Sequence, residues 1–231
     1  MAPGIVVAID GPAGSGKSSV SRAVAARLGF RYLDTGAMYR AVTWAVVEAG
    51  LDPDDSEAIG AWITGPSAPT IASGTDPDKP TIEVDGVDVG APIRGAAVTA
   101  NVSAVSAVPQ VRTFLVESQR AEALCASPGI VLEGRDIGSV VLPDADVKIF
   151  LTADPAVRAQ RRAAEVAPSS DAATIAATEQ ALRARDAKDS TRAVSPLTKA
   201  DGAIEVDTTH LSFDQVVDAV IGVVREREPS R

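Results

Sequence analysis

The fold is decided by the stretch Ile5-Val6-Val7-Ala8-Ile9-Asp10-Gly11-Pro12-Ala13-Gly14-Ser15-Gly16-Lys17-Ser18. Residues 5–9 are apolar, as in a strand buried inside a sheet, and residues 11–18 match the pattern G-x-x-x-x-G-K-[S/T]. Glycines let the backbone curl until several N–H groups converge on one anion. Val20, Val24 and Leu28 then recur at helical spacing, which adds the positive end of a helix dipole. Strand, loop and helix together predict a site for nucleotide phosphates.

The polar residues of this loop have distinct chemical uses. Lys17 would place a positive charge against the β- and γ-phosphates, and the Ser18 hydroxyl would face the Mg²⁺ ion that accompanies ATP. Ser19 carries the same hydroxyl one residue later, so the sequence leaves open which serine meets the metal. The loop residues expected to bind ATP are Gly11, Pro12, Ala13, Gly14, Ser15, Gly16, Lys17, Ser18 and Ser19. A glycine-rich turn that contains a lysine by chance is the competing interpretation.

The composition limits the class of protein and its partners. A chain of 231 residues, 45% of them hydrophobic, can bury one substantial core and leaves room for an inserted subdomain. Its formal net charge of −9 argues against nucleic acid or an anionic membrane as the main partner, because both attract a basic surface. With no basic leader and no apolar run long enough to span a bilayer, the chain is expected to be cytoplasmic.

The single cysteine and the single histidine exclude two kinds of site. Cys125 has no partner for an intramolecular disulfide and is expected to be a small buried residue. His210 rules out a metal site built from several histidines. Its position in Asp207-Thr208-Thr209-His210 favours a surface loop over a catalytic base.

Strands and helices alternate along most of the chain, which is typical of a parallel sheet covered by helices. Further strands are expected at 30–34, 130–132, 147–151 and 203–207, and helices are expected to begin at Thr35, Pro109, Pro155 and Phe213. Functional groups of such sheets lie beyond the carboxyl ends of the strands. That rule points to Asp10, Asp34, Glu133, Arg135 and Asp136.

Residues 60–100 interrupt this alternation. Their composition shifts to Pro, Gly, Thr and Asp, and residues 81–89 alternate apolar and polar side chains around Asp85-Gly86. This pattern predicts an antiparallel hairpin. We therefore expect one unit with a core at 1–59, 101–157 and 188–231, an insert at about 60–100 and, as argued next, a lid at about 158–187.

The stretch from Arg158 to Lys199 is basic within an acidic chain. It holds eight Lys and Arg residues against five Asp and Glu residues, a balance of +3 (8 − 5), whereas the whole chain carries −9. Arginine binds phosphate oxygens bidentately and keeps its charge, so two helices joined near 167–171 could close over ATP as a lid and exclude water. A solvated helix face with ion pairs such as Arg185 with Asp189 is the competing interpretation.

Four segments together resemble the bacterial cytidylate kinases: the glycine-rich loop, Leu33-Asp34-Thr35-Gly36-Ala37-Met38-Tyr39-Arg40, Glu133-Gly134-Arg135-Asp136-Ile137-Gly138, and residues 185–197. The resemblance covers nearly the whole chain. It implies the P-loop NTPase fold, a three-layer α/β/α structure with a central five-stranded parallel sheet, an inserted antiparallel subdomain for the nucleoside monophosphate and a short helical lid. It also implies a monomer that transfers the γ-phosphoryl group of ATP to CMP or dCMP, with Mg²⁺ as cofactor.

The resemblance assigns roles to individual residues. The residues it implies for CMP are Thr35, Tyr39, Arg40, Ser103, Arg112, Arg135, Asp136, Arg185, Asp189 and Arg192. Among them, Arg112 and Asp136 would read the cytosine, because aspartate accepts from the exocyclic amine and arginine donates to the ring acceptors. The implied catalytic residues are Lys17, Arg135, Arg158 and Arg162, and Arg161 would contact ATP. The role of Glu133 stays open, with a loop carboxylate paired to an arginine as the alternative.

Two other functions compete with this one. A P-loop kinase of another small molecule, such as shikimate, is disfavoured by Arg112, Asp136 and the insert at 60–100. A regulatory protein that hydrolyses nucleotide would need ordered switch segments and a positioned water, for which the sequence gives no signal.

Replacing Lys17 with alanine is expected to reduce turnover at least about 100-fold, because the β- and γ-phosphates lose a positive charge that acts in the transition state. Circular dichroism and thermal unfolding should show that the variant remains folded. Wild-type turnover in a folded Lys17→Ala variant would remove the loop from the mechanism.

Overall fold

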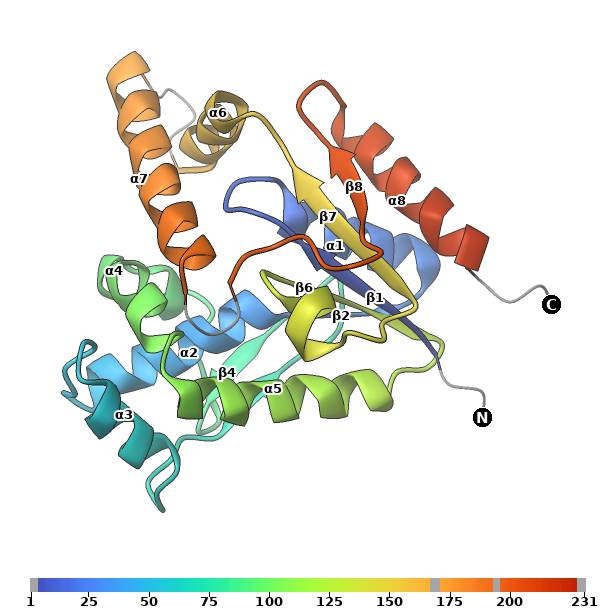
Figure 1. Cartoon of the computed structure of the whole chain (residues 1–231). Coiled ribbons are helices and arrows are strands. Elements are labelled where there is room, and N and C mark those ends of the chain that lie inside the picture. The colour runs from blue at the N-terminus through green and yellow to red at the C-terminus, as the bar shows by residue number, and fades with distance from the viewer. Residues whose placement is uncertain (1–3, 167–170, 193–195, 228–231) are drawn as a thin grey trace.

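A five-stranded parallel sheet forms the centre of the computed structural model, which describes residues 4–166, 171–192 and 196–227 (Figure 1). The strand order is β2-β6-β1-β7-β8. The strands are β1 (Ile5–Asp10), β2 (Arg31–Asp34), β6 (Gly129–Gly134), β7 (Val147–Thr152) and β8 (Ile204–Asp207). Val7 of β1 lies opposite Val131 of β6 and Val147 of β7. The predicted parallel sheet is confirmed, and each strand lies within two residues of its expected position.

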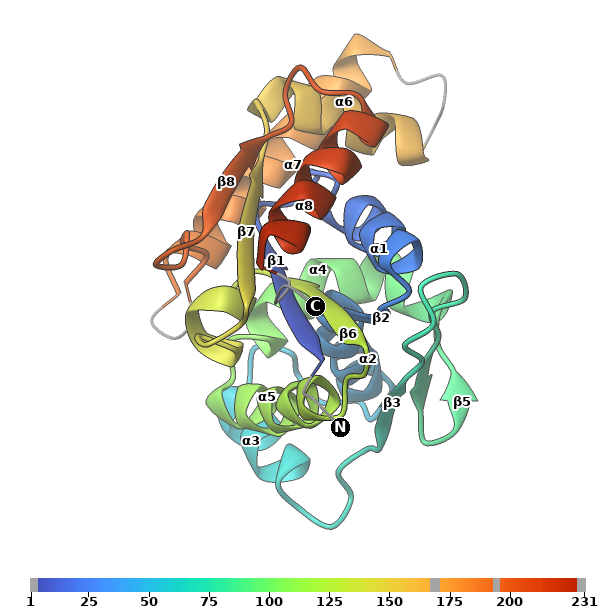
Figure 2. The same cartoon turned by 90° about the vertical axis from the view of Figure 1, so that its right-hand side faces the viewer.

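Helices cover both faces of this sheet (Figure 2). On one face, α1 (Lys17–Leu28) and α8 (Phe213–Arg227) pack with Val7 and Ile9 in one apolar cluster. On the other face, α2 (Thr35–Glu48), α3 (Ser56–Ile63), α4 (Ala96–Val105) and α5 (Pro109–Leu124) join a second cluster around Ala8 and Leu132. Because alternate strand residues point to opposite faces, β1 supplies both clusters. The three-layer architecture is confirmed.

The insert contains a small antiparallel sheet in the order β3-β4-β5. Its strands are β3 (Ile71–Ser73), β4 (Ile82–Val84) and β5 (Val87–Asp88), followed by the short helix η1 (Pro92–Arg94). Asp85 and Gly86 turn the predicted hairpin with φ values of 52° and 77°, as a two-residue hairpin turn requires. The three-residue β3 strand was not predicted, because it is too short to show alternation. Ile82 and Val84 share one core with α2, so the insert is not a separate hydrophobic unit.

Two helices, α6 (Pro155–Val166) and α7 (Ala172–Ser190), pack against each other beside the phosphate loop (Figure 1). Asp154 caps α6 by accepting from the backbone N–H of Ala156 at 2.8 Å. The expected loop tip at 167–170 lies outside the described residues, as do residues 193–195 of the fourth motif.

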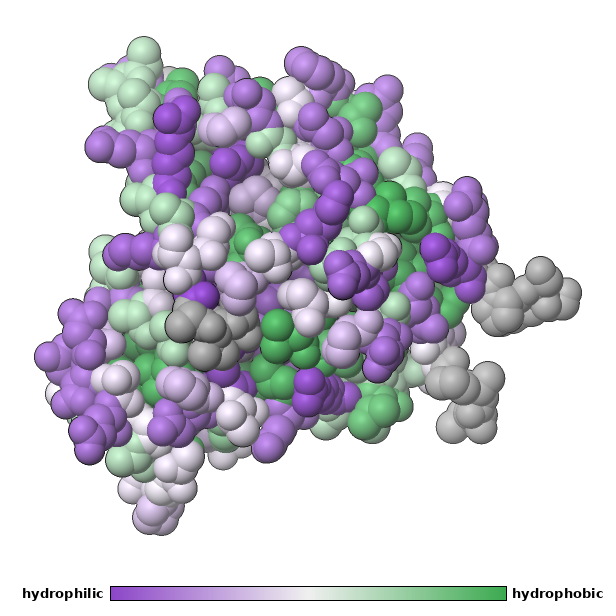
Figure 3. Space-filling model, viewed as in Figure 1, coloured by the Kyte–Doolittle hydropathy of each residue, from purple (hydrophilic) through white to green (hydrophobic). Residues whose placement is uncertain are grey.

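The exposure of several side chains can be compared with what the sequence predicts. His210 is exposed in a turn, as expected. Cys125, expected to be buried, is exposed instead, because it caps α5 where that helix ends at the surface. Arg112 and Gln119, polar residues of α5, are buried. Hydrophilic and apolar residues are interspersed over the face in Figure 3, and in the described part of the chain no helix could cross a membrane.

Asp10, the last residue of β1, ties the phosphate loop to the segment after β6. Its two carboxylate oxygens accept from the backbone N–H groups of Ile137 at 2.9 Å and Gly138 at 2.8 Å. These residues open a π-helical turn, η2 (Ile137–Val141). Asp10 is 3% exposed, and burial raises its pKa to about 6 although the two hydrogen bonds oppose the rise. One carboxylate therefore fixes the start of the loop relative to Asp136.

The contribution of Asp10 to the free energy of unfolding is expected to fall as pH rises from about 4 to about 6. The folded state holds the Asp10 proton up to about pH 6, whereas the unfolded chain releases it near 3.8, so stability is lost as the buried carboxylate ionises. Asp10→Asn cannot ionise and should gain stability relative to wild type over this range. Denaturant unfolding at several pH values measures the difference, and a constant difference would contradict the assignment.

Candidate active site

A cleft of about 510 Å³ opens at the carboxyl ends of the strands. Its walls come from the phosphate loop, α2, η1, the end of β6, α6 and α7. Six basic side chains face two acidic ones: Lys17, Arg40, Arg94, Arg135, Arg162 and Arg185 against Asp34 and Glu133. In a chain with a net charge of −9, this concentration of positive charge defines a site for anions.

The phosphate loop has the geometry that its sequence predicts. Gly14 and Gly16 have φ values of 75° and 85°, which residues with a Cβ rarely adopt, and Gly16 caps α1. Lys17 is 6% exposed, and its Nζ donates to the carbonyl of Pro12 at 2.7 Å. Burial, and next the charge of Arg135, lower the pKa of Lys17. A bound phosphate would counter both effects by supplying a negative charge.

Glu133 is the fifth residue of β6 and is 3% exposed. Burial and the nearby Asp34 carboxylate raise its pKa to about 7, while Lys17 and hydrogen bonds from Tyr32 and Ser18 lower it. The Tyr32 hydroxyl donates to Glu133 Oε1 at 2.5 Å. The interpretation of Glu133 as a loop carboxylate paired with an arginine is therefore wrong. Its carboxylate instead faces the phosphate loop from the neighbouring strand.

The oxygen donors near the loop fit a magnesium ion that is held mainly by phosphate. Ser18 and Ser19 are both exposed and both line the cleft, and Ser18 also lies close enough to Glu133 to lower the pKa of its carboxyl. Mg²⁺ is commonly bound through one or two carboxylates together with substrate phosphates. Within the described ranges no group of three or more His, Cys, Asp or Glu residues could hold a metal by itself.

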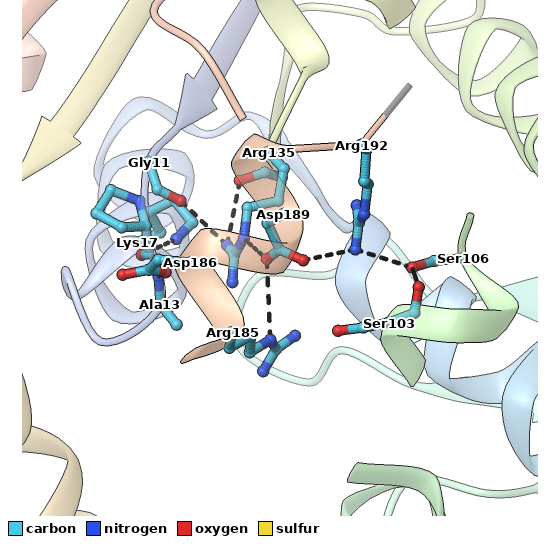
Figure 4. A network of polar contacts seen from close by, with 12 residues as sticks. Gly11, Ala13, Lys17, Ser103, Ser106, Arg135, Arg185, Asp186, Asp189 and Arg192 are labelled. Atoms are coloured by element: carbon cyan, nitrogen blue, oxygen red, sulfur yellow. Dashed lines mark hydrogen bonds and ion pairs between the residues drawn. The ribbon is translucent and has the colours of Figure 1, made fainter. Parts of the chain in front are cut away.

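Asp189, near the end of α7, gathers three arginines in a network shown in Figure 4. It is 1% exposed. Its Oδ2 atom lies 3.1 Å from Arg135 Nε and 3.9 Å from Arg185 Nε, and its Oδ1 lies 2.6 Å from Arg192 Nη2. Arg135 also donates to the carbonyl of Gly11 at 3.1 Å. The ion pair of Arg185 with Asp189 exists, but it belongs to the cleft rather than to a solvated helix face.

The same network reaches α4. Arg192 donates to the Ser106 hydroxyl at 3.1 Å, and Ser106 donates to the carbonyl of Ser103 at 3.3 Å. Through Ser106, the structure thus connects Ser103 to Arg192, which follows α7, although the two segments lie far apart in the sequence (Figure 4).

The arginines around the cleft lie close enough to repel one another. Arg40 donates to the carbonyl of Ile93 at 3.1 Å and to the Thr99 hydroxyl at 3.0 Å, and burial followed by the charge of Arg162 lowers its pKa. Burial, Arg135 and Arg40 likewise lower the pKa of Arg185 to about 10. Such crowding favours a dianion in the space between them.

Arg94 is a charged cleft residue that the sequence did not predict. It is the last residue of η1, in the stretch Pro92-Ile93-Arg94-Gly95. No strand end or loop motif marked it, because only the packing of the insert against α2 brings η1 to the cleft.

A buried ion pair lies in the same region. Arg112 Nη2 donates to Asp136 Oδ2, with side-chain exposures of only 5% and 6%. The Arg112 guanidinium lies 5.5 Å from the centre of the Tyr39 ring, a cation–π contact. Thr35 donates to the carbonyl of Glu133 at 2.6 Å. The structure thus groups Tyr39, Arg112 and Asp136, which the resemblance had assigned to one ligand.

The three arginines expected in the lid have different surroundings. Only Arg162 lines the cleft. Arg158 is 6% exposed and donates to the carbonyl of Ala13 at 2.9 Å and to Asp186 at 2.5 Å. Asp186 also accepts from the backbone N–H of Ala13 at 3.1 Å. Arg161 donates twice to Thr208, at 2.9 and 2.7 Å. Arg158 and Arg161 therefore brace the loop and the sheet here.

A phosphate loop on β1, faced across a cleft by a second group of arginines, defines a P-loop protein that can hold two phosphorylated groups. The model of the cytidylate kinase family matches residues 7–226, and the chain belongs to this family. It is 56% identical over 229 residues to a cytidylate kinase of Streptomyces avermitilis, covering 99% of this chain and 96% of that one. It is 52% identical to a cytidylate kinase of Mycolicibacterium paratuberculosis, covering 98% of each chain.

A solved structure supports the fold. An uncharacterized protein from Eubacterium ventriosum is similar with a TM-score of 0.51 at 12% sequence identity, covering 96% of this chain and 98% of that one. At this identity the likeness concerns the fold alone.

Arg158→Ala is expected to destabilise the protein by about 2–3 kcal/mol, because it removes a buried guanidinium that donates to the carbonyl of Ala13 and to the partly buried Asp186 carboxylate. Arg162→Ala should destabilise the protein less than Arg158→Ala, because Arg162 is exposed, and should lower kcat more than the affinity for the acceptor. Denaturant unfolding and steady-state kinetics of the two variants provide the comparison. Equal stability of both variants would contradict the bracing role of Arg158.

Proposed function

We propose that this chain transfers the γ-phosphoryl group of ATP to CMP or dCMP and releases ADP with CDP or dCDP. The observation that carries the proposal is the cleft itself, in which the phosphate loop faces a second group of arginines beside the buried Arg112–Asp136 pair. The charge fits two phosphorylated ligands, and the ion pair fits the edge of a base. Membership of the cytidylate kinase family supports the same reaction.

In this proposal, charge neutralisation and positioning do most of the catalytic work. Lys17 and the loop amides bind the ATP phosphates, while Arg40, Arg94 and Arg135 hold the acceptor phosphate. The acceptor oxygen is already nucleophilic at neutral pH, so no general base is required. Arg162 neutralises charge that develops on the transferred group, and Arg158 acts by holding the loop in place. Without these positive charges, the γ-phosphate of ATP and the acceptor phosphate would repel each other at the distance needed for reaction.

We further propose that Mg²⁺ accompanies ATP and that Ser18 and Glu133 face it. The ion would neutralise phosphate charge and orient the phosphate oxygens when it is bound. Ser18 is preferred over Ser19 because its hydroxyl lies close enough to Glu133 to lower the pKa of that carboxyl. Once ionised, the Glu133 carboxylate would add a negative charge to that of the nearby Asp34 carboxylate, and both charges would favour a Mg²⁺ ion there.

For the acceptor, we propose that Asp136 accepts from the cytosine amine while Arg112 donates to the ring. Thr35, Tyr39 and Ser103 would complete the base pocket. The sugar would contact Arg185, Asp189 and Arg192. Asp189 is suited to this role because it fixes both arginines at one end of the cleft.

We also propose a division of the chain into functional parts. It comprises a core at 1–59, 101–157 and 188–231, a monophosphate-binding insert at about 60–100 and a lid at about 158–187. The small sheet at residues 71–88 supports the insert, and the pair α6 and α7 supports a helical lid. We propose a cytoplasmic monomer without nucleic-acid or membrane partners, in keeping with the net charge of −9.

An acceptor panel tests the function. Purified protein with ATP and Mg²⁺ should release ADP when CMP or dCMP is supplied, at least about 100-fold faster than with AMP, GMP or shikimate. ADP release measured by a coupled assay gives the rates. Preference for AMP would overturn the roles of Arg112 and Asp136, and ADP release without any acceptor would instead favour a hydrolytic regulatory protein.

A further inference from the structure

Gln119 is a buried polar residue to which the proposed reaction gives no role. It lies on α5, its side chain is 0% exposed, and within the described residues neither its Nε2 nor its Oε1 atom makes a hydrogen bond. A buried amide without partners costs roughly 1–3 kcal/mol per unsatisfied group. A leucine would fill the same space without this cost, so the amide calls for an explanation other than packing.

The surroundings of Gln119 connect it to the base pocket. It follows Arg112 by seven residues, which places both on the same face of α5. The Tyr39 hydroxyl is also buried without a hydrogen bond among the described residues. Burial raises the pKa of Tyr39 to about 12, and Gln119 lies close enough to the hydroxyl to oppose that rise. Among the described residues, an amide and a hydroxyl without hydrogen bonds thus lie close to each other, and the ring that carries the hydroxyl contacts Arg112.

We propose that Gln119 is a positioning residue that holds the Tyr39 hydroxyl and, through the Tyr39 ring, keeps the Arg112 guanidinium in one orientation. This proposal rests on the proposed function and extends it to substrate choice. With Arg112 held, the pocket selects a pyrimidine that carries an amine at ring position 4 over one that carries a carbonyl there.

The selectivity follows from donor and acceptor geometry. An ionised aspartate only accepts hydrogen bonds and an arginine only donates them. Cytosine presents an amine donor beside a ring-nitrogen acceptor, whereas uracil presents a carbonyl acceptor beside an N–H donor. If Arg112 cannot move, the uracil carbonyl faces the Asp136 carboxylate and is rejected. If Arg112 can swing, it can meet that carbonyl while Asp136 takes the N–H.

Gln119→Met tests the proposal, because methionine keeps the length of the side chain and removes both polar atoms. The ratio of kcat/KM for CMP to that for UMP should fall about tenfold, mainly through faster reaction of UMP. Tyr39→Phe, which removes one hydroxyl, should lower the ratio by a similar factor. The double variant should show no further loss, because both changes release the same arginine.

Ser21→Ala is the matched control. Ser21 on α1 is also 0% exposed, and its hydroxyl has no hydrogen bond among the described residues, but α1 packs on the opposite face of the sheet from α5 and Tyr39, so its loss should leave the ratio unchanged. An unchanged ratio in folded Gln119→Met would overturn the inference and make Gln119 a packing residue, and multiplicative losses in the double variant would overturn the connection through Tyr39. If Gln119→Met fails to fold, Tyr39→Phe alone decides. Wild-type protein that accepts neither CMP nor UMP would refute the proposed function instead.

Discussion

The structure depends on buried carboxylates, above all Asp189, that hold several arginine side chains close together around the cleft. Arginines crowded around one cleft repel one another, as the lowered pKa values of Arg40 and Arg185 indicate. Asp189, itself 1% exposed, offsets this repulsion by contacting three guanidinium groups at once. The remaining positive charge faces the cleft, where a phosphate can neutralise it. The ion pairs with Asp189 therefore hold the arginines in place before a ligand binds, so the site is preorganised.

Two other carboxylates connect parts of the chain that are distant in sequence. Asp10 joins the phosphate loop to η2, and Asp186 joins α7 to the backbone of Ala13. Arg135 lies between these connections and donates to both Gly11 and Asp189. A displacement of α7 would therefore reach the loop through two routes. A movement of the proposed lid would therefore change the position of the loop that binds the phosphates.

Much of the fold was predictable because its signals are local. The apolar run at 5–9, the glycine-rich loop and the alternation that follows specify strand, turn and helix within a few residues, and the Asp85-Gly86 turn specifies a hairpin. The burial of Gln119 and the exposure of Cys125 were not predictable, because they depend on which element packs against α5. The bracing role of Arg158 was hidden for the same reason, since its partners lie 145 and 28 residues away.

The sequence by itself determined the phosphate loop, the parallel sheet and the identity of most residues around the cleft, because each rests on spacing within a short segment. Only the tertiary structure decided which of those residues face the ligand and which face one another. Arg94 lines the cleft, Arg158 instead pairs with Asp186, Glu133 is buried beside Tyr32, and Gln119 is buried without a hydrogen bond among the described residues. The physical reason is that charge pairing and burial are set by distance in space, and distance in space arises only when the layers pack.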